Sequence, residues 1–186
     1  DRFVFGPFSA MFSGGGYIRF EFAKKWVMGY EGAVEPVRFF LDQVATSDSY
    51  RSGIGYMVKT YFQNEAGRRW WNPRLGGRIY YNNTLGTEFR YVSATGELSN
   101  AFHILAALDV TLGTEVTYWR YPVKTGGRTD IMVLVMANSL YKITKKLSVL
   151  LNFDITSNNA TGGATDVATT FSYLRYNIMG GVSYSF

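Results

Sequence analysis

Several residue types that support common protein architectures are missing or scarce in this sequence of 186 residues. It contains no cysteine, which excludes disulfide scaffolds and thiolate metal sites and is compatible with an oxidising cell envelope. Its single histidine excludes a metal site built from several histidines. The longest aliphatic run, residues 131–137, falls far short of the roughly 20 apolar residues of a membrane-spanning helix. The sequence therefore excludes disulfide-rich modules and helical membrane proteins.

Aromatic residues, in contrast, are abundant, with 14 Tyr, 14 Phe and 4 Trp. β-strands favour aromatic side chains, and strands that cross a membrane carry aromatic belts at its two interfaces. The formal net charge of +5 would suit nucleic acid, but cations alternate with anions along the chain instead of clustering. We therefore expect no nucleic-acid partner.

The clearest structural signal is an alternation of apolar and polar residues, which is the period of a β-strand. In residues 174–186 the apolar side chains occupy even positions, and Arg175 and Asn177 lie between them. Soluble β-sandwiches also alternate, but their strands average about 5–6 residues, whereas several runs here are about twice as long. The pattern favours strands that cross a membrane.

Turn-forming residues between the alternating segments predict eight strands. The expected fold is an all-β, transmembrane, antiparallel up-and-down β-barrel of eight strands in a bacterial outer membrane. Turns near residues 82–84 and Asp109 would raise the number to ten. A two-residue hairpin would reverse the apolar parity, which instead continues through both places, so eight strands are preferred. The expected strands cover residues 17–28, 33–45, 51–63, 74–92, 99–121, 131–142, 146–156 and 168–186.

An even number of strands places both chain ends in the periplasm. We assign residues 17–186 to the barrel and residues 1–16 to a periplasmic extension or plug segment, with an extra strand as the alternative. No export signal is recognisable at the start, and we expect that one was removed. The expected connections are outer loops at residues 64–73, 122–130 and 157–167, and periplasmic turns at residues 93–98 and 144–146.

The final strand resembles the C-terminal assembly signal of bacterial outer-membrane β-barrel proteins, in which apolar residues at alternating positions precede an aromatic last residue. The resemblance covers only this strand, and it implies that the barrel-assembly machinery recognises the strand during biogenesis. The chain length suits the small, eight-stranded members, which include structural anchors, adhesins, lipid A-modifying enzymes and conduits for small ligands. The resemblance thus implies architecture more than function. The matching residues are Ile178, Gly180, Val182, Tyr184 and Phe186.

The polar parity is expected to face the barrel interior. An eight-stranded barrel is just wide enough for side chains to fill it, so charges inside it need to pair. We expect a closed interior with salt bridges; a narrow channel for ions or small polar solutes is the alternative. The expected charge network consists of Arg19, Glu21, Lys25, Arg38, Asp42, Lys59, Arg78, Glu88, Arg90, Asp109, Glu115, Asp154 and Arg175.

His103 is the only candidate for a histidine-based catalytic site. With eight strands it lies near the periplasmic end of its strand, whereas lipid A-modifying barrels of the resembled group carry catalytic His and Ser residues at the outer-leaflet edge. No serine or carboxylate lies at a telling spacing from it. We therefore expect no enzyme, no metal and no cofactor, and an outer-leaflet lipid-modifying enzyme is the third hypothesis.

The expected outer loops lean basic. Lipopolysaccharide carries phosphates at that level, which would attract such cations. The sequence thus predicts a monomeric outer-membrane protein, with outer-membrane lipids and lipopolysaccharide as partners and a structural or surface-interaction role. The expected lipopolysaccharide contacts are Arg68, Arg69, Arg74, Lys124 and Arg128.

Overall fold

The alternating segments form β-strands in the computed structural model, and the described residues contain no helix. The structure describes residues 9–39, 51–86, 89–122, 127–162 and 172–184. The strands are β1 (Ser9–Met11), β2 (Gly14–Ala23), β3 (Trp26–Phe39), β4 (Gly53–Asn64), β5 (Pro73–Thr84), β6 (Tyr91–Leu105), β7 (Leu108–Tyr121), β8 (Arg128–Lys142), β9 (Leu147–Thr161) and β10 (Tyr173–Tyr184).

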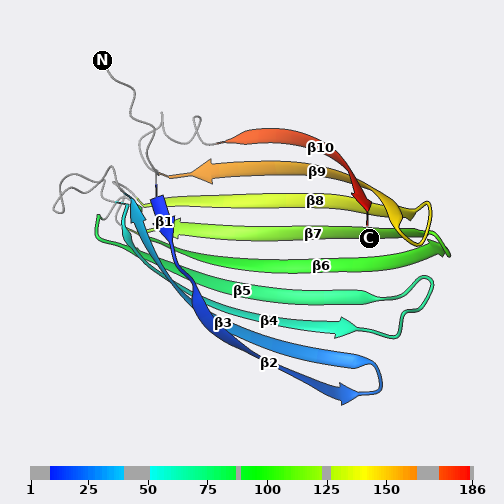
Figure 1. The fold of residues 1–186 in the computed structure, drawn as a ribbon. Coiled ribbons are helices and arrows are strands. Elements are labelled where there is room, and N and C mark those ends of the chain that lie inside the picture. Colours follow the sequence, from blue (N-terminus) through cyan, green and yellow to red (C-terminus); the bar gives the residue numbers. More distant parts are fainter. Residues whose placement is uncertain (1–8, 40–50, 87–88, 123–126, 163–171, 185–186) are drawn as a thin grey trace.

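All the strands belong to one antiparallel sheet that follows the order of the chain (Figure 1). β1 and β2 both pair with β3, β1 against residues 37–39 and β2 against residues 26–34. The sheet is therefore nine strands wide, from β1 and β2 at one edge to β10 at the other. The predicted all-β, antiparallel, up-and-down architecture is confirmed.

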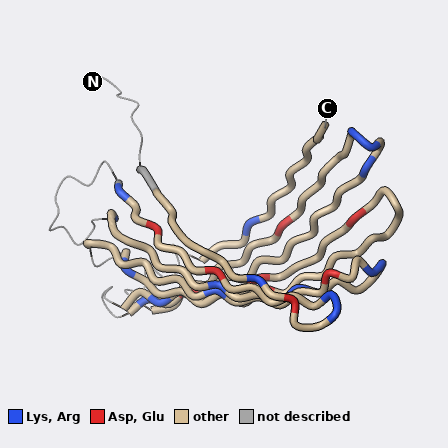
Figure 2. The backbone as a smooth tube through the Cα atoms, turned by 60° about the horizontal axis from the view of Figure 1, so that its bottom comes forward, with Lys and Arg blue, Asp and Glu red and all other residues tan. Residues whose placement is uncertain are grey.

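The sheet bends into a trough whose two edges stay apart (Figure 2). Within the described ranges, no backbone pairing joins β10 to β1 or β2, so closure into a barrel stays a prediction. Because the sheet has an odd width, β2 and β10 run in the same direction. The chain enters β1 at one end of the trough and leaves β10 at the other (Figure 1). The expectation that the barrel starts and finishes on one side is therefore wrong for these strands.

Three of the predicted strands each contain a chain reversal, so the bounds of these strands are wrong, while the number of strands in a closed barrel stays a prediction. Two of the reversals lie near residues 82–84 and Asp109, where the sequence offered alternative turns. The reversals lie at residues 24–25, 85–90 and 106–107. The first and third are two-residue hairpins, which normally reverse the parity of apolar residues.

A β-bulge in each two-residue hairpin explains why the sequence pattern does not reveal it. The register shifts between Glu21 and Ala23 in one hairpin and between His103 and Leu105 in the other. The extra residue of a bulge restores the parity that the turn reverses, so apolar residues stay even-numbered on both sides of each turn.

Two further predicted boundaries are wrong. β3 is continuous from Trp26 to Phe39, so no strand begins at residue 33; residues 40–45 lie outside the described residues. Residues 93–98, expected to be a turn, lie in the middle of β6, where their small side chains still alternate between the two faces. The β-strand also begins earlier than residue 17, because residues 9–11 and 14–16 belong to β1 and β2.

The two faces of the sheet differ in polarity and burial. In β6, Ser93 and Thr95 are buried, whereas Val92 and Leu98 on the opposite face are exposed. Side chains converge on the concave side of a bent sheet, so the more buried parity is the inner side of the trough. We call this inner side the polar face and the outer side the apolar face.

The connections at the two ends of the trough differ in length. We call the end at which β10 finishes the C-terminal rim; it holds residues 24–25, 65–72, 106–107 and 143–146. The connections that leave the strands at the opposite, N-terminal rim are residues 40–52, 85–90, 122–127 and 162–172, and they are longer than those of the C-terminal rim except for 65–72. Among the described residues no helix is long and apolar enough to span a membrane.

Candidate functional site

A three-membered charge cluster lies on the polar face, on the adjacent strands β4, β5 and β6. Glu97 Oε1 is 3.4 Å from both Lys59 Nζ and Arg74 Nε. A glycine, Gly76, pairs with Glu97 across the strands, and a Cβ at this glycine would lie 2.3 Å from Glu97 Oε1. The missing side chain of Gly76 therefore makes room for the carboxylate that joins the two cations.

A second charge cluster continues the network towards the N-terminal rim. Arg78 Nη2 lies 3.6 Å from Glu115 Oε1, and the Thr117 hydroxyl donates to the same oxygen at 3.2 Å. Thr117 is fully buried and its Oγ1 is 3.0 Å from that of Thr95 on β6. The cations of the two clusters thus lie on β4 and β5, and their carboxylate and hydroxyl partners lie on β6 and β7.

At the N-terminal rim, the side chains of Arg128 and Asp130 form a buried bidentate ion pair. The Arg128 guanidinium also lies over the ring of Tyr121, with its carbon 5.0 Å from the ring centroid. Arg128 was expected to contact lipopolysaccharide, but the structure commits its charge to an interior partner.

Most of the expected charge network lies on the polar face, but three members lie elsewhere. Lys25 occupies the hairpin turn at a φ of 68°, and Arg90 lies in the 85–90 connection, where it donates to the Thr84 carbonyl. Arg38 lies on the apolar face together with exposed Val34. The register of β3 is unbroken from Trp26, so all its even-numbered residues face this side. Asp42 and Glu88 lie outside the described residues. The members on the polar face are Arg19, Glu21, Lys59, Arg78, Asp109, Glu115, Asp154 and Arg175.

Four carboxylates of the polar face are absent from the predicted network: Glu31, Glu35, Glu97 and Asp130. Glu97 was assigned to a turn, and Asp130 was assigned to a loop. Extending the period of two through residues 91–105 would have placed Glu97 on the same face as Ser93 and Thr95.

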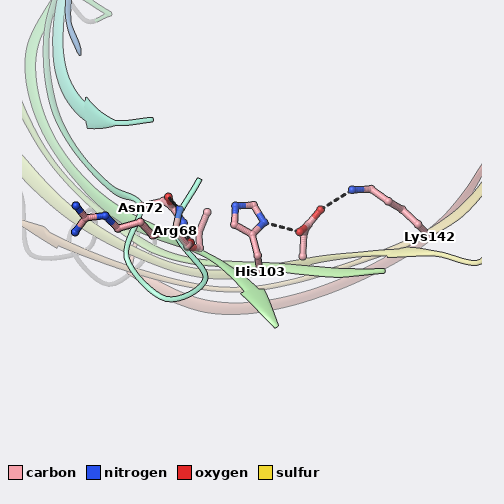
Figure 3. Close-up of polar contacts among 6 residues, drawn as sticks. Arg68, Asn72, His103 and Lys142 are labelled. Atoms are coloured by element: carbon pink, nitrogen blue, oxygen red, sulfur yellow. Dashed lines mark hydrogen bonds and ion pairs between the residues drawn. The ribbon is translucent and has the colours of Figure 1, made fainter. Parts of the chain in front are cut away.

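The connection between β4 and β5 at the C-terminal rim is a well-ordered loop rather than a flexible one. Asn72 Nδ2 donates to the carbonyls of Arg68 and Ala101, and Asn72 Oδ1 accepts from the Arg68 amide at 2.8 Å (Figure 3). The His103 amide donates to the Arg69 carbonyl at 2.8 Å, which extends the pairing of β6 onto the loop. Gly67 supplies the positive φ of 61° that closes the turn.

This loop holds four large side chains in solvent. Arg68, Arg69, Trp70 and Trp71 are all exposed, and the Arg69 guanidinium stacks over the Trp70 ring at 4.9 Å. The Arg69 guanidinium also donates to the Ile104 carbonyl at 3.1 Å. The loop therefore presents two cations and two indole rings on a fixed backbone.

His103 forms a polar chain with Asp109 and Lys142 beside this loop (Figure 3). His103 Nδ1 lies 2.7 Å from Asp109 Oδ1, and Lys142 Nζ donates to Asp109 Oδ2 at 2.9 Å. In the eight-strand prediction both residues lie on one strand, whereas the 106–107 turn makes them cross-strand neighbours. An open hollow of about 470 Å³ adjoins His103, lined also by Gly67, Arg69 and Ile104.

The imidazole of His103 contacts a carboxylate within the described residues. No hydroxyl is hydrogen-bonded to its imidazole there, so a nucleophile–base pair does not form. The described part of the chain also holds no group of three His, Asp or Glu residues that could bind a metal ion. The arrangement orients an imidazole and neutralises one lysine.

The five residues expected to contact lipopolysaccharide do not share one surface. Arg68 and Arg69 lie at the C-terminal rim, Arg74 joins the interior cluster around Glu97, and Arg128 is buried at the opposite rim. The expectation that residues 64–73 and 122–130 belong to the same side is wrong, because two reversals, at residues 85–90 and 106–107, replace the single turn expected at residues 93–98. Lys124 lies outside the described residues.

The residues of the expected assembly signal lie on the apolar face of the edge strand β10. Ile178, Val182 and Tyr184 are exposed, and Gly180 shares their parity. Phe186 lies outside the described residues. A scan against models of known protein families matches none, and searches of curated proteins and of solved structures likewise give no match.

Proposed function

We propose that this chain is a non-enzymatic, structural β-sheet wall of the bacterial outer membrane, with lipid on its apolar face and a salt-bridged interior on its polar face. One observation carries the proposal: large apolar side chains are exposed along one face of the whole sheet. Contiguous apolar patches on soluble monomers rarely exceed a few hundred Å². The exposed apolar side chains of this face include Ile18, Phe20, Val58, Ile79, Val116, Val133, Val135, Leu151, Leu174, Ile178 and Val182.

The polar face supports the proposal because its charges are mutually compensated. Lys59, Arg74 and Arg78 lie close to Glu97 or Glu115 across neighbouring strands. Such pairing is needed where charges are withdrawn from bulk water. In a soluble sheet the same charges would face solvent instead.

The two rims suggest an orientation for the sheet. Outer-membrane barrels have short periplasmic turns and longer extracellular loops. The three shortest connections, 24–25, 106–107 and 143–146, all lie at the C-terminal rim, so we assign that rim to the periplasmic side. Arg68 and Arg69 then face away from lipopolysaccharide.

The proposal requires the two free edges of the sheet to be covered in the membrane. Each unpaired backbone N–H or C=O group in hydrocarbon costs roughly several kcal/mol. Sheets that cross a membrane are therefore closed into barrels, which leave no unpaired edge. β2 and β10 run in the same direction, so direct pairing between them would be parallel. Closure that keeps every pair antiparallel requires an odd number of additional strands between these edges.

The test is the solvent in which the purified protein folds. We expect β-sheet circular dichroism and resistance to protease only in detergent micelles or lipid vesicles, because the apolar face needs an apolar solvent. A protein that stays folded and soluble in plain buffer, without detergent or lipid, would overturn the proposal.

A narrow channel is a second candidate, favoured by interior polar atoms with unused capacity. Asp154 Oδ2 is buried without a hydrogen-bond partner, and Arg175 forms no ion pair within the described ranges. Gaps in a polar network conduct ions or small solutes. Steady single-channel openings in planar bilayers would favour the channel over a sealed interior, and silent bilayers would remove it.

A further inference from the structure

The C-terminal rim carries an excess of cations that the interior network does not use. Within the described ranges, its acids are already engaged: Glu65 pairs with Arg19 at 2.5 Å, and Asp109 pairs with Lys142 and His103. The Glu21 carboxylate accepts the amide of Lys25. The exposed rim cations that form no ion pair in the described part of the chain are Lys24, Lys25, Arg68, Arg69, Lys145 and Lys146.

These cations are distributed along the rim rather than gathered at one point. They come from three separate connections, those of β2 to β3, β4 to β5 and β8 to β9. Lys and Arg lie in three of the four connections at this end of the sheet, and the 106–107 turn between two of these connections carries none (Figure 2). A distributed row of charges fits an extended anionic surface better than a single small anion.

The 65–72 loop carries a second, independent feature of this rim, a pair of exposed tryptophans. Trp70 and Trp71 are 54% and 56% exposed beside the cations, and hydrogen bonds of Asn72 and Asn100 fix their backbone. Exposed indoles are costly in water but favourable at the headgroup level of a membrane, where the ring is in apolar surroundings and its N–H is hydrated.

We propose that the C-terminal rim binds the phosphates of anionic phospholipid headgroups, with the 65–72 loop as its anchor. This inference rests on the proposed membrane location. Arg68 and Arg69 present guanidinium forks that match phosphate oxygens. The lysines of the β2–β3 and β8–β9 connections extend the contact along the leaflet. The His103–Asp109–Lys142 chain is a separate, internally neutralised group that leaves these six cations available.

The experiment uses the whole protein reconstituted in phosphatidylcholine vesicles, with spin-labelled phosphatidylglycerol or phosphatidylcholine as the probe. Electron paramagnetic resonance resolves the motionally restricted lipid at the protein surface. We expect phosphatidylglycerol to be enriched there by about fivefold, the effect of one basic residue near an anionic surface. The enrichment should fall in high salt because the attraction is electrostatic.

The decisive variant is Arg68→Gln/Arg69→Gln/Lys145→Gln/Lys146→Gln, which removes rim charge from exposed turns. Its control is Arg38→Gln/Arg120→Gln, which removes two exposed charges near the opposite end of the trough and is compared directly with Arg68→Gln/Arg69→Gln, which removes two at the rim. We expect the first variant to lower the enrichment towards one and the control to leave it unchanged. Circular dichroism in the same vesicles checks that each variant is folded.

The outcomes separate the two proposals. If restricted lipid is absent for both probes, the protein is not embedded and the proposed function fails. If restricted lipid is present without a preference for phosphatidylglycerol, or if the control variant removes the preference equally, the rim does not bind anionic headgroups.

Discussion

The apolar and polar faces of this sheet reverse the usual relation between side-chain chemistry and exposure. Val135 on the apolar face is 50% exposed, whereas Thr117 on the polar face is fully buried. Both lie near the middle of their strands, so position along the trough does not explain the difference. The comparison indicates that the exposed face requires a solvent other than water, and that the buried face is held by polar pairing.

The largest effect is expected from placing a charge on the apolar face, by Val135→Arg in the middle of β8. If lipid surrounds that face, the free energy of unfolding in vesicles should fall by about 2–4 kcal/mol, the cost of arginine near a bilayer midplane. Ile143→Arg, at a rim position of equal exposure, 52%, should cost about 0–1 kcal/mol. Denaturant titration in vesicles measures both, and equally small losses would show that the apolar face meets water.

The polar face can be tested by removing the space beneath Glu97. In Gly76→Ala the new methyl group would meet the Glu97 side chain, so we expect a loss of about 1–3 kcal/mol from overpacking. The neighbouring Gly77→Ala is the control, since its nearest contact is the Thr95 carbonyl at 3.7 Å on the apolar side. The same denaturant titration should separate the two variants, and a similar response from both would contradict the crowded interior.

The faces were predictable from sequence, whereas the bounds of several strands were not. The period of two assigns Lys59, Arg78, Glu115 and Asp154 to the polar face. Successive side chains of a strand point to opposite faces, so alternating polarity identifies the two faces of the sheet. The chain reversals at residues 24–25 and 106–107 are hidden because backbone bulges preserve that same parity. A bulge depends on backbone twist and leaves no mark in a pattern of polarity.

The contacts within the candidate sites also depend on where the chain reverses. The contact between His103 and Asp109 depends on recognising the turn between them, and the split between Arg68 and Arg128 depends on which end each connection occupies. Ala106 and Ala107 at that turn are neither glycine nor proline, so they carry no turn signal. Residue chemistry identified the charged groups, but topology decided their partners.

An intermediate effect is expected from Glu97→Gln, which leaves Lys59 and Arg74 together without their carboxylate. We expect a loss of about 1–2 kcal/mol, smaller than for a fully buried pair because all three side chains keep some solvent contact. Adding Lys59→Met to this variant should recover part of the loss. A double-mutant cycle measures the coupling energy, and a value of zero would mean that the cluster does not hold the strands together.

The smallest effect is expected at the C-terminal rim, from Asp109→Asn. This change removes the ion pair with Lys142 and the charge beside His103, but both partners are more exposed than the members of the Glu97 cluster. We expect a loss of about 0.5–1 kcal/mol that shrinks in 1 M salt, where the Debye length is about 3 Å. The loss from Glu97→Gln should change little with salt, because the interior excludes most of the counterions. Unfolding titrations of both variants at two salt concentrations make this comparison, and an equal salt response would show that the trough interior is as open to solvent as its rim.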